Sequence, residues 1–101
     1  MAYELHENAT ASKSTTPYLL NIQHDLCRSL STRVVLPVVF ERPVTSDTDF
    51  VLPMTVGEMT LYAVVAHVAS VPASALGTYI ADCSSYYDTI RERVDRLFIG
   101  F

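Results

Sequence analysis

Residues 50–66 read FVLPMTVGEMTLYAVVA, two apolar runs separated by Gly57-Glu58. Both runs are rich in valine, methionine and aromatic side chains, a composition typical of strands. Glycine at the first central position suits the type II′ turn that joins two antiparallel strands. The stretch therefore predicts a β-hairpin in which residues 50–56 pair with residues 59–66.

Upstream of this hairpin, residues 33–41 (RVVLPVVFE) are rich in β-branched side chains and predict a longer strand. Pro37 lies in its middle and cannot donate a ladder hydrogen bond, so we expect an edge strand or a β-bulge there. Three shorter extended segments are expected, at residues 3–6, 18–23 and 71–76. Two polar stretches predict exposed loops, the first of them mobile, at residues 7–17 and 42–49.

Near the C-terminus the apolar residues change to a helical period. Four of them recur at i, i+4, i+7 and i+8 and form one stripe, namely Ile90, Val94, Leu97 and Phe98. Ser85 followed by Asp88 resembles a capping box. Glu92 precedes Arg96 at the spacing of a helix ion pair. Gly100 then predicts the end of the helix.

The chain has 101 residues, which suits a single domain spanning residues 1–101. Six or so short strands and one terminal helix predict the α+β class, mostly β, as a small twisted sheet or barrel with a helix packed on it. Half of the residues are hydrophobic and 18% are charged. A core of this size is modest, so a partner subunit would help to bury apolar surface.

The charge balance argues against direct nucleic-acid binding. The net charge is −4 and the pI is about 5.1. A duplex-binding domain needs a basic face, whereas the one local cluster, Arg91, Arg93 and Arg96, is interleaved with acidic residues. A basic protein segment is a better match as partner.

The N-terminal residues lack the pattern of a secretory signal, and no apolar stretch has membrane-spanning length, so we expect a cytoplasmic location without membrane contact. In that compartment Cys27 and Cys83 are expected to be free thiols.

Residue types that carry catalysis or hold metals are thinly spread. The three histidines have no cysteine or carboxylate at ligand spacing, and the two cysteines form no CxxC pair, which argues against a zinc site. Ser84 and Ser85 are interpreted as helix caps. Asp82 and Asp88 could form a carboxylate pair, yet both also suit a helix N-terminus. We expect no metal, no cofactor and no enzymatic activity.

Several segments in fixed order carry a family resemblance: LNIQHDL (20–26), RVVLPV (33–38), VASVP (68–72), ALG (75–77), IADCS (80–84) and the terminal helix that leads to Gly100-Phe101. In this combination the chain resembles the CcdB family of plasmid and chromosomal toxins. The similarity spans nearly the whole chain and is thinnest at residues 7–17 and 42–56.

This resemblance implies a small SH3-like, CcdB-type barrel sheet with a three-stranded wing and one C-terminal helix. It also implies a two-fold homodimer that binds the A subunit of DNA gyrase and traps its cleaved-DNA complex. A CcdA-like antitoxin would neutralise the toxin. The complex would repress its own operon, with DNA contacted only through the antitoxin.

The family's gyrase-binding positions correspond to six residues of this chain: Leu26, Cys27, Asp95, Ile99, Gly100 and Phe101. The best-known member of the family has tryptophan in place of Ile99 and asparagine in place of Asp95. An indole can stack on an arginine, whereas isoleucine contributes apolar burial alone. The helix pattern by itself favours another interpretation, in which Ile99 and Phe101 complete the stripe against the sheet. Cys27 could likewise be a small buried hydrophobe.

Two other functions stay open. The MazF/Kid mRNA endonuclease toxins are similar in fold to CcdB, but such an enzyme needs a positioned base and cationic groups around the scissile phosphate. The scattered arginines and the acidic pI argue against it. A degenerate toxin, retained for antitoxin binding and operon autoregulation, is suggested by Ile99.

Overall fold

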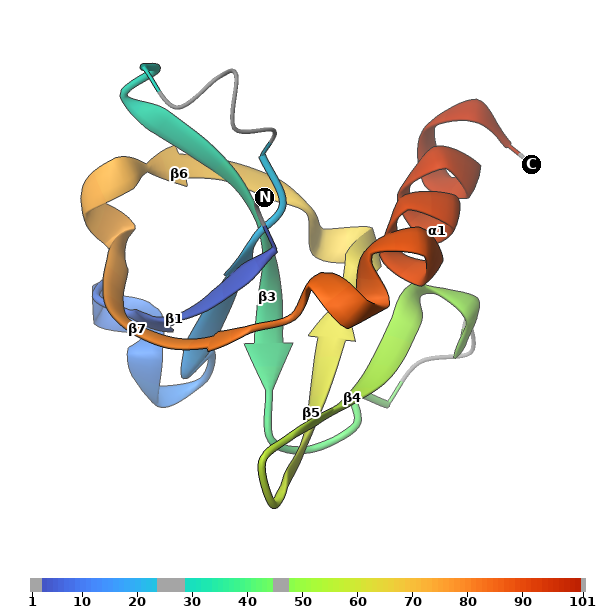
Figure 1. Ribbon diagram of the computed structural model, residues 1–101, viewed down its shortest axis with the longest axis horizontal. Helices are drawn as coiled ribbons and strands as arrows, with labels where there is room; N and C mark the ends of the chain where they lie inside the picture. Colours follow the sequence, from blue (N-terminus) through green and yellow to red (C-terminus); the bar gives the residue numbers. More distant parts are fainter. Residues whose placement is uncertain (1–2, 24–28, 45–47, 101) are drawn as a thin grey trace.

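The computed structural model describes residues 3–23, 29–44 and 48–100. In this part of the chain seven strands form one antiparallel sheet, and a helix follows the last strand (Figure 1). The elements are β1 (Glu4–Asn8), η1 (Ala11–Ser14), β2 (Tyr18–Asn21), β3 (Thr32–Val39), η3 (Thr48–Phe50), β4 (Val51–Val56), β5 (Met59–Val64), η4 (Val65–His67), β6 (Ala69–Pro72), η5 (Ala73–Ala75), β7 (Leu76–Asp82), η6 (Ser84–Tyr86) and α1 (Tyr87–Ile99), where η marks a 3-10 turn. The strand order is β4-β5-β3-β2-β1-β7, with β6 paired to β3 beside this path. The predicted class, α+β and mostly β with a C-terminal helix, is confirmed.

Strand β3 lies at the centre of the sheet, so the edge position expected from Pro37 is wrong. β2 pairs along one side of β3, while β6 pairs with residues 32–35 and β5 with residues 38–39 on the other side. The Val34 carbonyl faces β2, where it accepts the Ile22 N–H at 3.0 Å. Because backbone groups alternate in direction along a strand, the Pro37 nitrogen faces the other side. It falls between the partners β6 and β5, where no ladder hydrogen bond is required of it.

Strands β4 and β5 form the predicted hairpin, in register from Val51↔Val64 to Val56↔Met59. Gly57 has a φ of 60°, as the first central position of a type II′ turn requires. With the end of β3, the hairpin makes three adjacent strands that correspond to the expected wing. The Tyr86 hydroxyl accepts the Thr55 N–H at 2.8 Å, so the outer edge of β4 is partly covered.

The main core lies on one face of the sheet. Leu5, Leu20 and Leu36 stand opposite one another on β1, β2 and β3, and all three are fully buried. Ile90 of α1 and Cys83 belong to the same cluster, so the helix is held by the burial of its first turns.

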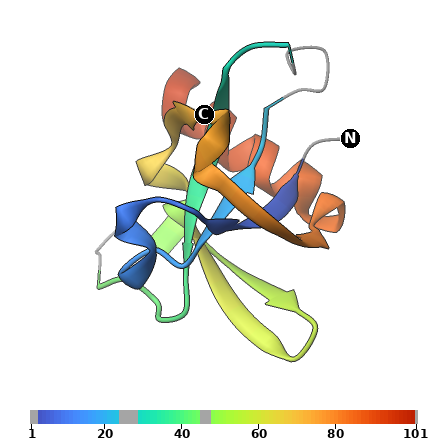
Figure 2. The ribbon, with the colours of Figure 1, turned by 90° about the vertical axis from the view of Figure 1, so that its left-hand side faces the viewer.

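The β6–β7 connection closes the side of the barrel (Figures 1 and 2). A single extended segment at residues 71–76 is contradicted, because η5 turns the chain and β7 returns to pair with β1. Ala75 of this turn is buried in a second, smaller cluster with Leu19 and Val35, on the sheet face opposite the main core. Burial of Ala75 against the sheet stabilises this turn. The local sequence does not indicate this tertiary contact, so the turn could not be predicted from it.

The predicted loop at residues 7–17 is built around a buried amide. Strand β1 continues past its predicted end to Asn8, whose side chain is 4% exposed. The Asn8 amide nitrogen donates to the Ser12 hydroxyl at 3.0 Å and to the Thr16 carbonyl at 2.8 Å. Its oxygen accepts the Thr10 N–H at 2.9 Å. The polar composition of this segment therefore reflects an internal hydrogen-bond network as well as exposure.

The start of α1 differs from the capping box predicted from Ser85 and Asp88. Tyr86 occupies the N-cap position and makes no side-chain cap bond. The Asp82 carboxylate instead accepts the Ser84 N–H at 2.9 Å, one turn earlier, at η6. The cap roles expected for the two serines are therefore wrong, and Asp82 organises the entry to the helix.

The apolar stripe of α1 is buried only in its first half. Ile90 is fully buried and Val94 packs against the main core. Leu97 is partly buried, and Phe98 is 70% exposed, so its expected place in the core is wrong. Neither α1 nor any other helix among the described residues has the length and apolar character to cross a membrane.

Candidate functional site

Three of the six predicted binding residues lie together at the C-terminal end of α1, which projects beyond the sheet (Figure 1). They are Asp95, Ile99 and Gly100. The other three lie outside the described residues, namely Leu26, Cys27 and Phe101. The structure therefore describes the part of the predicted site that lies at the end of α1.

The last two apolar side chains of α1 both face solvent. Phe98 is 70% exposed and Ile99 is 59% exposed. The interpretation in which Ile99 packs against the sheet is thus wrong. Adjacent residues are about 100° apart around a helix, so the pair covers a broad sector of the last turn. Clustered exposed apolar side chains of this kind mark protein-binding surfaces.

Asp95 lies one turn before Ile99, on the same side of the helix. The two residues line a shallow hollow of about 340 Å³ together with Asp88, Arg91 and Glu92. The Arg91 side chain is 4.0 Å from the Asp95 carboxylate. Arg96 neutralises the Glu92 carboxylate at 2.8 Å, which leaves Asp88 as the carboxylate of this hollow without an ion-pair partner among the described residues. The hollow therefore suits a cationic side chain beside an apolar one.

Basic residues on another side of α1 anchor the helix to the body of the protein. The Arg96 guanidinium lies 2.8 Å from the Glu92 carboxylate, which confirms the predicted ion pair, and 3.6 Å from the Asp49 carboxylate. Arg93 donates to the Asp49 carbonyl at 2.7 Å. These contacts with η3 hold the middle of α1 and leave its last turn uncovered.

Gly100 ends the helix as predicted. Its φ of 90° is left-handed, and its N–H donates to the Arg96 carbonyl at 2.9 Å. A Cβ atom at this position would have no neighbour within 4 Å. Glycine is therefore favoured here by the left-handed backbone angle and not by crowding. The left-handed residue turns the chain away from the helix axis.

The base of α1 rests on buried residues of the main core. The rings of Tyr3 and Tyr87 have centroids 4.9 Å apart, and the Cys83 N–H donates to the Tyr3 carbonyl at 2.8 Å. Tyr3 has a φ of 71°, a strained angle for a bulky residue. Burial raises the pKa of both Tyr3 and Cys83 above their ordinary values, and Cys83 is a free thiol, as expected. These groups fix the helix in place and offer no reactive thiolate.

The exposure of Phe98 is the feature that sequence reasoning missed. Its spacing from Ile90 fits the stripe, but α1 packs on η3, η4 and η6, which reach only part of its length. The available signal was the glycine cap two residues later, because a side chain in the final turn has no following turn to cover it.

Comparison with solved structures shows the same fold in several toxins. An endoribonuclease from a mycobacterial species, solved with its cognate antitoxin, superposes with a TM-score of 0.77 over 97% of this chain and 93% of that one, at 11% identity. A toxin described as Mtb toxin gives a TM-score of 0.72 at 15% identity, covering 93% and 99% of the two chains. The Mycobacterium tuberculosis toxin MazF-mt6 gives 0.73 at 14% identity, covering 95% and 96%. At these identities the likeness concerns the fold.

Sequence comparison is more specific. No curated protein matches the chain. The profile of the CcdB protein family, in contrast, matches residues 2–100. Where the structure describes them, the segments that carry the resemblance lie on or directly beside β2, β3, β6, β7 and α1. The chain belongs to the CcdB family and is a toxin of the toxin–antitoxin type.

Proposed function

We propose that this toxin acts by binding the A subunit of DNA gyrase through the last turn of α1, and not by catalysis. The observation that carries the proposal is the exposure of Phe98 and Ile99 directly before the left-handed Gly100. Although the core of this chain is small, the Phe98 and Ile99 side chains are left exposed to water at the end of the helix. This arrangement supports a role in binding, since more than half of each side chain faces solvent.

The chemistry of the last turn defines the target surface. Ile99 offers apolar burial, which is worth about 1.5–3 kcal/mol for a side chain that becomes fully buried. Asp95 adds a negative charge one turn earlier, at the edge of the acidic hollow. The complementary patch on gyrase should thus combine an apolar depression with a lysine or arginine.

The proposal includes two further partners. A second copy of the chain would place two helix ends side by side, which suits a target that is itself two-fold symmetric. A CcdA-like antitoxin would neutralise the toxin. Family membership supports both partners, and the mycobacterial endoribonuclease of the same fold was solved with a cognate antitoxin.

Gyrase supercoiling and gyrase-dependent DNA cleavage test the proposal. Ile99→Ala should weaken inhibition of supercoiling at least tenfold. The reason is that truncating a central apolar side chain at an interface often costs about 2 kcal/mol or more of binding free energy. Val44→Ala is the matched control, since Val44 is fully exposed and aliphatic but distant in sequence from α1. The control should poison gyrase as well as the native chain does. Equal potency of Ile99→Ala and the native chain would place the binding site elsewhere.

A second candidate is an mRNA endonuclease, favoured by the TM-score of 0.77 with an endoribonuclease. Its test runs beside the first: a long RNA is incubated with the purified chain and followed by gel electrophoresis. RNA cleavage without gyrase inhibition would replace the first proposal with the second. Loss of both activities, with antitoxin binding retained, would identify a degenerate toxin.

A further inference from the structure

A closed ring of polar contacts joins the middle of α1 to η3. The Arg96 guanidinium lies 3.6 Å from the Asp49 carboxylate and 2.8 Å from the Glu92 carboxylate. Glu92 also accepts a hydrogen bond from Arg93 at 3.1 Å, and Arg93 donates to the Asp49 carbonyl at 2.7 Å. The contacts therefore return to Asp49, which is held through its side chain and through its backbone. These four residues form the η3 ring.

The η3 ring lies where the core stops supporting the helix. Among the described residues of α1, Val94 is the last to pack on the main core. Ile99 lies five residues further along the chain. It is thus about 7 Å beyond that point on the helix axis, from the rise per residue of an α-helix. A helix end of this length can tilt about its last fixed point, and the contacts of residues 92–96 with η3 oppose that tilt.

The ring is continuous with the predicted binding turn. The Arg96 side chain contacts Asp49, while the Arg96 carbonyl accepts the Gly100 N–H at 2.9 Å. Glu92 also lines the hollow beside Ile99. The ring therefore connects η3 both to the cap that ends the helix and to the surface next to its exposed apolar side chain.

Two separate attachments restrict the rotation of the helix as well as its position. Arg93 and Arg96 are three residues apart, so they lie on one side of α1, and both contact η3 at Asp49. Exposed ion pairs contribute little to the free energy of unfolding. The Asp49 side chain is 64% exposed. The η3 ring is therefore better suited to orient the end of α1 than to hold the fold together.

We propose that Asp49 is a positioning residue for target binding, which acts through Arg93 and Arg96 to hold the last turn of α1 in one orientation. The inference rests on the proposed function, because the target is the gyrase surface that receives Ile99. The apparent affinity of a protein falls with the fraction of molecules in the binding-competent state. Without the η3 ring the helix end samples several orientations, and only some of them bring Ile99 to its site.

The first experiment removes the two attachments in turn. Asp49→Ala deletes the carboxylate but keeps the backbone carbonyl that Arg93 contacts, whereas Asp49→Ala/Arg93→Gln removes both contacts. The single variant should inhibit gyrase supercoiling about threefold more weakly than the native chain, and the double variant about tenfold more weakly, as a fall of the competent fraction to about one tenth requires. Asp49→Glu keeps a carboxylate and should inhibit nearly as well as the native chain.

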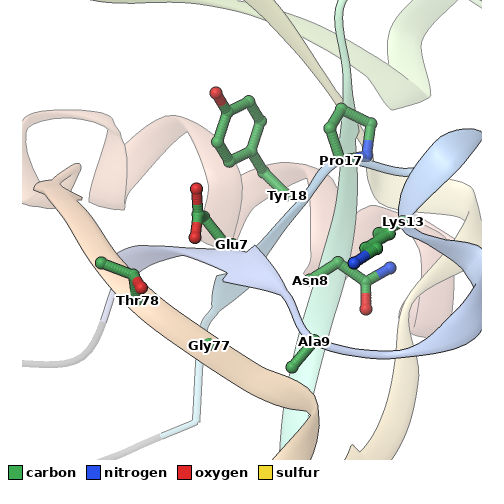
Figure 3. A pocket seen from close by; sticks show the side chains of 8 residues that line it. All are labelled: Glu7, Asn8, Ala9, Lys13, Pro17, Tyr18, Gly77 and Thr78. Atoms are coloured by element: carbon green, nitrogen blue, oxygen red, sulfur yellow. The ribbon is translucent and has the colours of Figure 1, made fainter.

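Glu7→Ala is the matched control, since it also deletes one exposed carboxylate. Glu7 lines a hollow between β1, β2 and β7 (Figure 3), and Figure 1 shows β1 on the other side of the molecule from the C-terminal end of α1. The control should inhibit gyrase as the native chain does. Native-like melting temperatures of all variants would show that orientation, not folding, has changed.

The second experiment measures NMR order parameters of the backbone amides in the full chain. In the double variant those of residues 97–99 should fall from about 0.85, typical of rigid backbone, toward the flexible range below about 0.6. Residues 87–90, where α1 packs on the main core, should keep their native values. Unchanged order parameters at the helix end would overturn the proposal even if inhibition were lost, because Asp49 would then contact the target directly.

The supercoiling assay keeps this inference distinct from the proposed function. Failure of the native chain to inhibit gyrase would reject the proposed function, whatever the order parameters of the variants. Inhibition by the native chain together with an equally potent double variant would reject the positioning role of Asp49 alone.

Discussion

At the scale of single residues, Asn8 places an amide group among buried positions that are otherwise apolar in the described part of the chain. Its side chain makes four hydrogen bonds with the segment between β1 and β2, to Ser12, to the Thr16 carbonyl and to both the N–H and the hydroxyl of Thr10. A buried donor or acceptor left without a partner costs about 1–3 kcal/mol. The conformation of this segment therefore depends on one side chain.

Asn8→Ala should lower the free energy of unfolding by about 1–3 kcal/mol, because it removes both the donors and the acceptor. Urea denaturation monitored by circular dichroism measures the change. Ser14→Ala, an exposed position in η1, should stay within about 0.5 kcal/mol of the native chain. Comparable losses for the two variants would mean that the amide network carries no stability.

Cys83 yields a second prediction at this scale. It is 2% exposed, and burial raises the pKa of its thiol. The thiolate is the reactive form, so alkylation by iodoacetamide at pH 8 should be slower in the folded chain than in urea by a factor on the order of 100 or more. Peptide-resolved mass spectrometry distinguishes Cys83 from Cys27. Rapid alkylation of Cys83 without urea would place it at the surface.

At the scale of elements, local signals predicted the β4–β5 hairpin and the end of α1, where Gly57 and Gly100 both adopt positive φ. The centre of the sheet could not be predicted in this way. Taken from the local sequence alone, Pro37 indicates an edge strand. Its place in a central strand is possible because β6 pairs with β3 before Pro37 and β5 pairs with β3 after it. The same holds for the last turn of α1, because the exposure of Phe98 depends on where η3 and η4 cease to cover the helix.

The entry to α1 has its own pH dependence. The backbone hydrogen bond from Ser84, followed by the Ser84 side chain, lowers the pKa of Asp82 below its ordinary value of 3.8. A lowered pKa means that the bond stabilises the fold above the ordinary value and is lost as the pH falls through the lower, folded one. An NMR titration of the Asp82 carboxyl should therefore show a midpoint below 3.8. A midpoint at or above that value would remove Asp82 from the helix entry, and Asp82→Asn should abolish the titration.

At the scale of the whole molecule, we expect an obligate homodimer. Strand β6 is largely exposed at Ala69, Ser70 and Pro72, positions that are small and uncharged. We predict that the two copies contact each other through residues 68–71 and through the C-terminal ends of their helices. Sedimentation at micromolar concentration should give twice the chain mass of 11.2 kDa. A single species of 11.2 kDa would contradict the prediction.

The pairing of β1 with β7 has a consequence for the order of synthesis. Residues 4–8 leave the ribosome well before residues 76–82, their partner on one side, have been made. At about 5–20 residues per second, β1 waits several seconds before the barrel can close. The helix that carries the exposed Phe98 and Ile99 is translated later still. A nascent chain therefore has neither the closed sheet nor the exposed helix end until residues 76–99 have been made.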